Sequence, residues 1–337
     1  MENQLPENPL NTEENSSPTD VFVYPPKLPA DEPRSQVSVW TRSIGSLLLY
    51  LAIGYYFFNQ NWTLVLVLTG VVLFHELGHF LAMKAYNYTD LGIFFIPLLG
   101  AYASGKKHEV SQLQSSVILL AGPVPGIIAG TLIQFIAPLL TNDYEQLRML
   151  ERISWILIYL NLLNLLPIYP LDGGQLLNRL FLDSSELISK IFLVLSIATL
   201  AWFALYGGDR PYYALLIIPF FLLTRLIADT NLDKLTKKVE SEGINLDTSY
   251  EDLSDEDYWK IRNILIRNHS SLRDVAEAPP YEHSHKESQI KTLIQNILQR
   301  TIVQDMSITG KIVIIAVWVG CFAIPFLINL PLRLNAY

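Results

Sequence analysis

Two histidines and a glutamate interrupt an apolar stretch, VLVLTGVVLFHELGHFLAMKAY, that otherwise has the composition of a membrane helix. His75 and His79 lie four residues apart, so on an α-helix they are separated by about 40° around the axis and both imidazoles can reach one metal ion. Glu76 lies about 100° round from His75, where its carboxylate can act on a ligand of that ion without binding the ion. These residue types at this spacing predict a metal centre with a general base beside it.

The sequence HELGH at 75–79 has the H-E-x-x-H spacing that is typical of zinc hydrolases. An accidental match, or a structural polar cluster between helices, is the alternative. A carboxylate at the centre of a bilayer costs roughly 2.5 kcal/mol or more on insertion scales, so ionisable groups persist there mainly where they react or bind. We therefore favour the zinc site. The small residues nearby, Gly70, Gly78 and Ala82, are explained by close packing of another helix.

A catalytic zinc site needs a third protein ligand and an open position for water. The remaining histidines all lie in polar segments, where exposed side chains are the better interpretation: His108, His269, His283 and His285. Cys321 stands alone in the last apolar run and is interpreted as a packing residue. Asp172 follows two prolines and precedes two glycines, so the chain is expected to be unwound there, which membrane depth tolerates only under protein or water. An ordinary turn is the alternative, but beside the histidines Asp172 is the predicted third ligand.

The elements that must position these residues are membrane helices. Half of the 337 residues are apolar and only 17% are charged, which is the balance of a membrane protein. The net charge of −8 gives no basic surface for nucleic acid. Apolar runs that can cross about 30 Å of hydrocarbon lie near 43–59, 62–86, 115–139, 153–171, 187–207, 212–228 and 311–331. The predicted fold is therefore an all-α polytopic membrane protein with about seven transmembrane helices.

The distribution of Lys and Arg predicts the orientation. With the N-terminus in the cytoplasm, the outer side receives only Arg148, Arg152, Arg210 and Arg333, and the inner side receives most of the others. This bias favours a cytoplasmic N-terminus. The span that carries His75 then runs inward, and the span before Asp172 ends on the same side. Both halves of the site are thus expected at similar depth, towards the cytoplasm.

The polar segments divide the chain into four predicted parts. These are a disordered cytoplasmic tail at 1–42, a membrane domain at 43–232, a small cytoplasmic segment at 233–309 and a C-terminal transmembrane helix at 310–337. The tail is rich in Pro, Glu, Asn and Ser, which offer too little apolar surface for folding, and it lacks the features of a cleaved signal peptide. In the third part, Ser254 and Asp257 predict the capped start of an amphipathic helix.

Residues 87–114 predict a membrane-associated β-hairpin or re-entrant loop, because aromatic and β-branched residues are broken there by Gly and Pro. A strand at this place could pair with an opened substrate backbone through Leu99, Gly100 and Ala101. The alternative is a surface loop that anchors the helices through Phe94 and Phe95.

Two motifs together resemble the site-2 protease family (peptidase family M50), zinc metalloproteases that cut within the membrane. The first is HELGH, and the second is NLLPIYPLDGG at 164–174, which is similar to the family's Asn-Pro…Leu-Asp-Gly motif. AGPVPG at 121–126 resembles the AGP sequence of the third core helix. The resemblance covers roughly residues 62–182, a three-helix catalytic core. The family often has Asn where this chain has Gly126, and Pro where it has Tyr169, which leaves the substrate fit open.

The resemblance implies that His75, His79 and Asp172 bind one Zn²⁺ per chain, with Glu76 as the general base. Asn164 would assist at the substrate carbonyl, with an interhelical hydrogen bond as the alternative. Asn161 is interpreted as such a structural residue. The implied function is a zinc metalloendopeptidase that hydrolyses a peptide bond within or near a transmembrane segment of a single-span, membrane-anchored protein, in regulated intramembrane proteolysis. The implied location is the lipid bilayer of a bacterial plasma or inner membrane.

Three other classes of protein compete with this interpretation. A zincin with a soluble domain would take its third ligand from a downstream Glu in that domain, and no such domain is apparent. A di-iron lipid desaturase would need about eight histidines, and the chain has six. A catalytically silent membrane-binding or chaperone relative would have lost Glu76 or a ligand, and all are present. This silent relative is the alternative retained.

Overall fold

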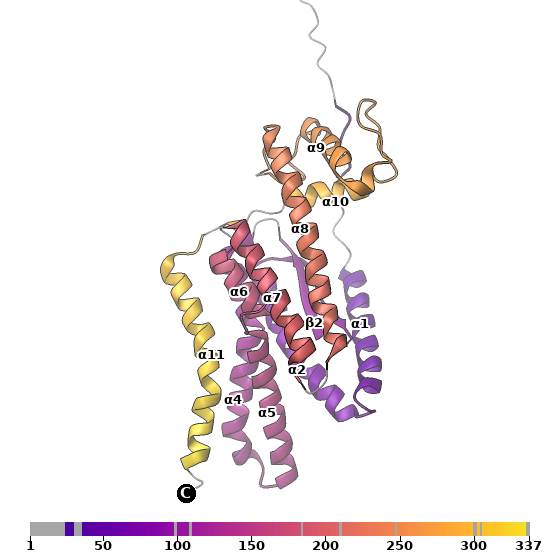
Figure 1. Ribbon diagram of the computed structural model, residues 1–337. Helices are drawn as coiled ribbons and strands as arrows, with labels where there is room; N and C mark the ends of the chain where they lie inside the picture. The colour runs from indigo at the N-terminus through magenta and orange to yellow at the C-terminus, as the bar shows by residue number, and fades with distance from the viewer. Residues whose placement is uncertain are drawn as a thin grey trace, which may run out of the picture.

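The helices of the chain form two bodies (Figure 1). The computed structural model describes residues 24–29, 36–97, 100–107, 110–182, 185–208, 211–246, 248–298, 302–303 and 305–334. Most helices stand side by side in a bundle, and a smaller body of helices lies beyond one end of it, at the top of Figure 1. One long helix, α8, runs from the bundle into the smaller body.

The bundle contains α1 (Gln36–Phe57), α2 (Trp62–Ala85), α3 (Gln112–Ala121), α4 (Pro123–Leu140), α5 (Tyr144–Asn164), α6 (Asp172–Leu177), α7 (Glu186–Tyr206), α8 (Ile217–Ser241) and α11 (Ile308–Leu334). The smaller body contains α9 (Asp255–Asn268) and α10 (Glu287–Leu298). The strands are β1 (Thr89–Ile96), β2 (Gly100–Lys106), β3 (Val110–Ser111) and β4 (Ile302–Val303). A π-helical turn follows α6, and short 3₁₀ turns precede α8 and follow α9.

Five helical segments of the described chain are long and apolar enough to cross a membrane: Trp62–Ala85, Gln112–Leu140, Leu187–Tyr206, Tyr213–Ser241 and Ile308–Pro325. They match five of the seven predicted spans. The other two correspond to α1 and α5, which are helical as predicted but more polar. α5 begins with Glu145, Arg148, Glu151 and Arg152 within its first turns. That these two helices also cross the membrane stays a prediction.

The predicted hairpin between 87 and 114 is confirmed. β1 and β2 pair antiparallel, with Phe95 opposite Ala101 and Ile93 opposite Ala103. β1 lies against α1, where Phe95 donates its backbone N–H to Ser46 Oγ over 3.1 Å. α1 begins at Gln36 rather than at residue 43, because residues before 43 already contact the hairpin. The side chain of Val39 is buried and fills the space beside Gly92.

Small residues allow the helices around the centre of the bundle to approach closely. A Cβ atom on Gly78 of α2 would lie 1.9 Å from the carbonyl oxygen of Ala121, where α3 ends. α4 and α5 run side by side as a hairpin (Figure 1), and Ser154 Oγ donates to the carbonyl oxygen of Gly130 over 2.7 Å. Backbones at this distance hold side chains of α2 and α5 within reach of one another.

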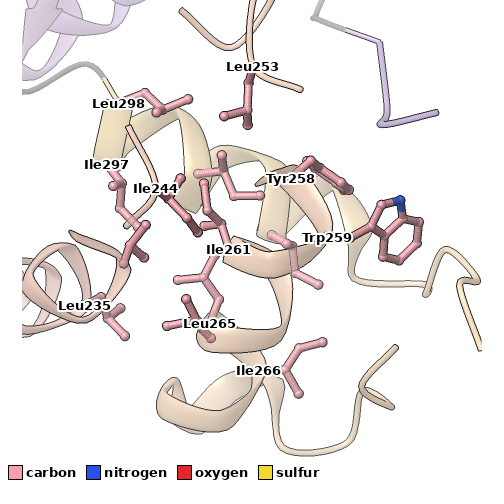
Figure 2. Close-up of a cluster of buried hydrophobic side chains, with 14 of the residues drawn as sticks. Leu235, Ile244, Leu253, Tyr258, Trp259, Ile261, Leu265, Ile266, Ile297 and Leu298 are labelled. Atoms are coloured by element: carbon pink, nitrogen blue, oxygen red, sulfur yellow. The ribbon is translucent and has the colours of Figure 1, made fainter. Parts of the chain in front are cut away.

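The smaller body, called here the small domain, comprises residues 232–298 and has its own apolar core. The end of α8, the loop that follows it, α9 and α10 all contribute buried side chains, among them Leu235, Ile261, Leu265 and Ile297 (Figure 2). The predicted capped helix is confirmed: α9 starts after Ser254, whose Oγ accepts the backbone N–H of Asp257 over 3.0 Å.

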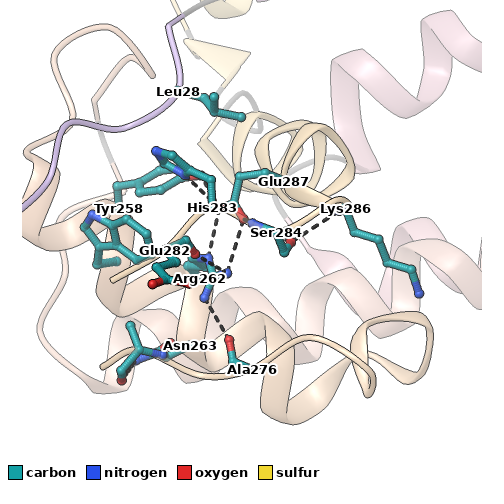
Figure 3. Close-up of polar contacts among 12 residues, drawn as sticks. Leu28, Tyr258, Arg262, Asn263, Ala276, Glu282, His283, Ser284, Lys286 and Glu287 are labelled. Carbon is teal, nitrogen blue, oxygen red and sulfur yellow. Dashed lines mark hydrogen bonds and ion pairs between the residues drawn. The ribbon is translucent and has the colours of Figure 1, made fainter. Parts of the chain in front are cut away.

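A buried ion pair fixes α9 to α10 inside the small domain (Figure 3). Arg262 donates from Nε to Oε1 of Glu287 over 2.9 Å and from Nη2 to Oε2 over 3.2 Å. The Tyr258 hydroxyl also donates to Oε1, and the backbone N–H of Ser284 donates to Oε2. Nη1 of Arg262 donates to the carbonyl oxygen of Ala276. Because these partners saturate both charged groups, the pair can remain buried.

Candidate metal centre

His75 and His79 lie on one face of α2, with their Nε2 atoms 3.1 Å apart. The other nitrogen of each ring has an acceptor. Nδ1 of His75 is 2.7 Å from Oδ1 of Asn161, and Nδ1 of His79 is 2.7 Å from the carbonyl oxygen of Ile118. Nδ2 of Asn161 donates to the carbonyl oxygen of Leu157, which assigns Oδ1 as an acceptor. Both Nδ1 atoms therefore carry the proton, and both Nε2 atoms present lone pairs to the same point.

A break in the helical backbone carries Asp172 to this point. α5 ends at Asn164, residues 165–171 form turns, and α6 starts at Asp172. A Cβ atom on Gly173 would lie 1.9 Å from the carbonyl oxygen of Leu165, so only glycine permits the chain to fold back this closely. The predicted unwinding is confirmed, and protein surrounds it.

With both Nδ1 atoms protonated, the three side chains present only acceptor atoms to one another. Oδ2 of Asp172 lies 3.1 Å from Nε2 of His75 and 3.2 Å from Nε2 of His79. This oxygen is buried and has no hydrogen-bond partner among the described residues. In tetrahedral zinc sites, ligands at about 2.0–2.1 Å from the ion lie about 3.3 Å from one another. The donor types and their spacing therefore fit three ligands of one zinc ion.

Glu76 is buried beside this set and is held by the hairpin. Its Oε2 accepts the backbone N–H of Ala103 on β2 over 2.7 Å. This bond fixes the carboxylate without using Oε1. The hairpin and the metal centre, which the sequence placed near one another only along the chain, are thus in direct contact.

Residues 63–148 match the model of peptidase family M50. Over these residues the chain is similar to that family. It is 27% identical over 154 residues to a zinc metalloprotease of Methanocaldococcus jannaschii, across 43% of this chain and 44% of that protein. It is 30% identical over 118 residues to stage IV sporulation protein FB of Bacillus subtilis, across 35% of this chain and 40% of that protein.

The matches thus cover less than half the length of these curated relatives. Among solved structures, the site-2 protease from Methanocaldococcus jannaschii has a TM-score of 0.40 and 21% sequence identity, covering 54% of this chain and 87% of that chain.

Asn161 has a role in this centre that sequence reasoning missed. It was interpreted as a structural residue, but its fully buried side chain orients the ring of His75. One signal was present: Asn161 lies one helical turn before Asn164, on the buried face of α5. Asn164 itself ends α5, is partly exposed, and has no hydrogen-bond partner among the described residues.

Two glycines of the AGPVPG segment make room for this centre. A Cβ atom on Gly122 would lie 2.2 Å from Nε2 of His79, and one on Gly126 would lie 2.2 Å from Nδ2 of Asn161. Gly126, where the family often has Asn, therefore leaves space for Asn161. A side chain at 126 would displace Asn161, the residue that orients His75.

The other residues considered lie outside this centre. His269, His283 and His285 are in the small domain, and Cys321 is buried in the core of the bundle as a packing residue. Gly100 and Ala101 lie on β2, whereas Leu99 and His108 fall outside the described residues.

Proposed function

We propose that this chain is a zinc endopeptidase that hydrolyses a peptide bond within or near a transmembrane segment of a single-span, membrane-anchored protein. The observation that carries the proposal is the set of three convergent acceptors at His75, His79 and Asp172, with Glu76 buried beside it. The match of residues 63–148 to the model of peptidase family M50 supports the reaction class, and five apolar helices support the membrane location.

In the proposed reaction, His75, His79 and Asp172 hold one zinc ion, which would supply a Lewis acid that makes a water molecule acidic and polarises the scissile carbonyl. Glu76 removes the proton from this water at Oε1, because Oε2 is occupied by Ala103. The hydroxyl adds to the carbonyl carbon, the C–N bond breaks, and Glu76 returns the proton to the leaving amine nitrogen.

Asn164 is proposed to donate its side-chain amide to the developing oxyanion. Its partly exposed side chain at the end of α5, one turn from Asn161, supports this role.

Seven spans with a cytoplasmic N-terminus remain the proposed topology. α5 returns antiparallel beside α4 to the level of His75, as a membrane-crossing helix would. Residues 24–29 contact the small domain, so these two parts lie on one side of the bundle, as the topology requires. The excess of Lys and Arg makes that side cytoplasmic.

β2 is proposed to receive the substrate backbone at Gly100 and Ala101. In an antiparallel pair, alternate residues direct their N–H groups away from the partner strand. The N–H of Ala103 points away from β1 to Glu76, and that of Ala101, two residues away, therefore faces the same side. The alternative anchoring role has support at Phe95, which is buried against Tyr50 of α1.

The test compares cells that contain the wild-type chain with cells that contain Glu76→Gln or Asp172→Ala. Single-span proteins that stay uncut in both variants, found by proteomics of membrane and soluble fractions, would be the substrates. Elemental analysis should show zinc retained in Glu76→Gln, which loses the base and no ligand, and reduced in Asp172→Ala. The matched control is Cys321→Ala, which is buried in the bundle away from the centre. Identical membrane and soluble proteomes for all four chains would contradict the proposal.

A further inference from the structure

Residues 24–29, with the sequence YPPKLP, run across the surface of the small domain. They form neither helix nor strand. Three of the six are prolines and lack an N–H group, so a backbone of this composition is recognised mainly through its carbonyl oxygens. The small domain supplies the donors.

Two aromatic side chains donate to carbonyl oxygens three residues apart. Nε1 of Trp259 donates to the oxygen of Pro25 over 2.8 Å, and the hydroxyl of Tyr250 donates to the oxygen of Leu28 over 2.8 Å. A polyproline II helix has three residues per turn, so these carbonyls share one edge of such a segment. Aromatic donors spaced to match that edge are typical of grooves that bind proline-rich peptides.

Lys27 gives the contact its side-chain selectivity. Its backbone N–H donates to Oδ1 of Asp255 over 2.8 Å. Its Nζ donates to the carbonyl oxygens of Glu251 and Leu253 and lies 5.6 Å from the centre of the Tyr250 ring. An ammonium group is the side chain that can satisfy these carbonyls and the ring face together.

The two ends of the segment are also held. The ring of Tyr24 meets that of Tyr281 edge-on at 5.5 Å, and Tyr281 meets Trp259 in the same way. At the other end, Nζ of Lys291 donates to the carbonyl oxygen of Pro29 over 2.6 Å. Pro26 is exposed, which makes it the natural position for a control substitution.

The core of the small domain is complete without the segment. Every fully buried apolar side chain of its core comes from residues 235–298, and Tyr24 is only partly buried against it. The small domain can therefore stay folded when the segment leaves. Residues 30–35 are all that separate the segment from α1, so the segment is present at a high effective concentration.

We propose that this surface of the small domain, formed by Tyr250, Asp255, Trp259 and Lys291, is an exchangeable recognition site for proline-containing peptides, and that residues 24–29 are its ligand in cis. The site selects an aromatic residue first and a lysine at the fourth position, in a segment that contains proline. A segment of another protein with this chemistry competes with residues 24–29 and, on binding, frees the small domain from the chain that leads into α1.

The test uses a labelled peptide of residues 22–31 and the chain purified in detergent, with binding followed by fluorescence anisotropy. A chain that lacks residues 1–30 should bind the peptide. The intact chain should bind it at least about tenfold more weakly, because its own segment occupies the binding surface. In the peptide, Lys27→Ala should lose most of the binding, whereas Pro26→Ala should stay within about twofold. In the shortened chain, Tyr250→Phe should weaken binding about fivefold, as expected for one lost hydrogen bond.

Two results would overturn the proposal. One is a shortened chain that keeps its near-ultraviolet circular dichroism but does not bind the peptide. The other is equal affinity of the intact and the shortened chain. If the intact chain were instead a dimer that became monomeric on deletion of residues 1–30, the segment would act between copies, and the assignment in cis would be wrong.

Discussion

At the scale of single residues, the neighbours of the two imidazoles decide what the centre can hold. Asn161 and the carbonyl group of Ile118 each take an Nδ1 proton, which leaves both Nε2 lone pairs directed at Asp172. Three acceptors at this spacing repel one another unless a cation lies between them. The orienting partners are therefore as much a part of the centre as its ligands.

Asn161 and Asn164 should respond differently to substitution by alanine. Asn161→Ala removes the partner of His75 Nδ1, and loss of such a partner costs about 10–100-fold in metal affinity. Asn164→Ala should leave zinc affinity unchanged and lower the turnover of an identified substrate about 10²–10³-fold, as for a lost oxyanion donor. Zinc affinity by competition with a chelator, together with turnover at saturating zinc, separates the two roles. Equal zinc affinity of Asn161→Ala and wild type would contradict the first.

The convergence of His75, His79 and Asp172 could be predicted from the sequence because spacing along a single helix determines where the two histidines point, and because prolines and glycines mark the break before Asp172. The role of Asn161 could not. Whether its amide meets another helix or a histidine depends on how α5 packs against α2, and that packing rests on close approaches such as Gly126 to Asn161.

At the scale of elements, the hairpin is the part of the fold whose position matters most for the proposed reaction. β2 contacts α2 through the bond from Ala103 to Glu76, so any change in β2 also reaches the base. A proline at Ala101 removes one N–H on that side of the strand but keeps the bond at Ala103.

Ala101→Pro should therefore lower cleavage of an identified substrate at least tenfold while zinc content stays the same. Ala101→Ser, which keeps the N–H group, is the matched control and should cleave normally. A helix-breaking Gly or Pro in the substrate near the cut should raise the rate. Normal cleavage by Ala101→Pro, in protein shown to be folded and zinc-loaded, would end the case for strand pairing.

The apolar runs predicted the positions of the helices well, but they did not show that one run contains two helices. The predicted span at 115–139 is α3 and α4, which meet at Gly122. Nothing in hydropathy marks this junction, because it is the ring of His79 that requires the glycine there. The apolar core of the small domain was not predicted for a similar reason, since this core joins segments that are far apart in the chain.

At the scale of the whole molecule, the bundle and the small domain differ in what stabilises them. The bundle has helices that are long and apolar enough to cross a membrane, whereas the small domain folds around its own apolar core and one buried ion pair. Burial alone would raise the pKa of Glu287. Hydrogen bonds from Arg262, the Ser284 backbone and Tyr258 outweigh this and hold the pKa below its usual range.

A carboxylate with a lowered pKa stabilises the folded state above its unfolded pKa, and this contribution is lost as the pH falls through the folded value. The small domain should therefore melt at a progressively lower temperature below about pH 4.5. Near-ultraviolet circular dichroism of its aromatic cluster can follow this change.

Glu287→Gln leaves Arg262 buried without its charge partner, so it should destabilise the small domain at pH 7 by about 3–5 kcal/mol. It should also make the melting temperature of the small domain depend less on pH. Glu256→Gln is the matched control, because its pair with Lys260 is exposed and should contribute little to stability. An acid response that is the same in Glu287→Gln as in wild type would show that another group controls the stability of the small domain.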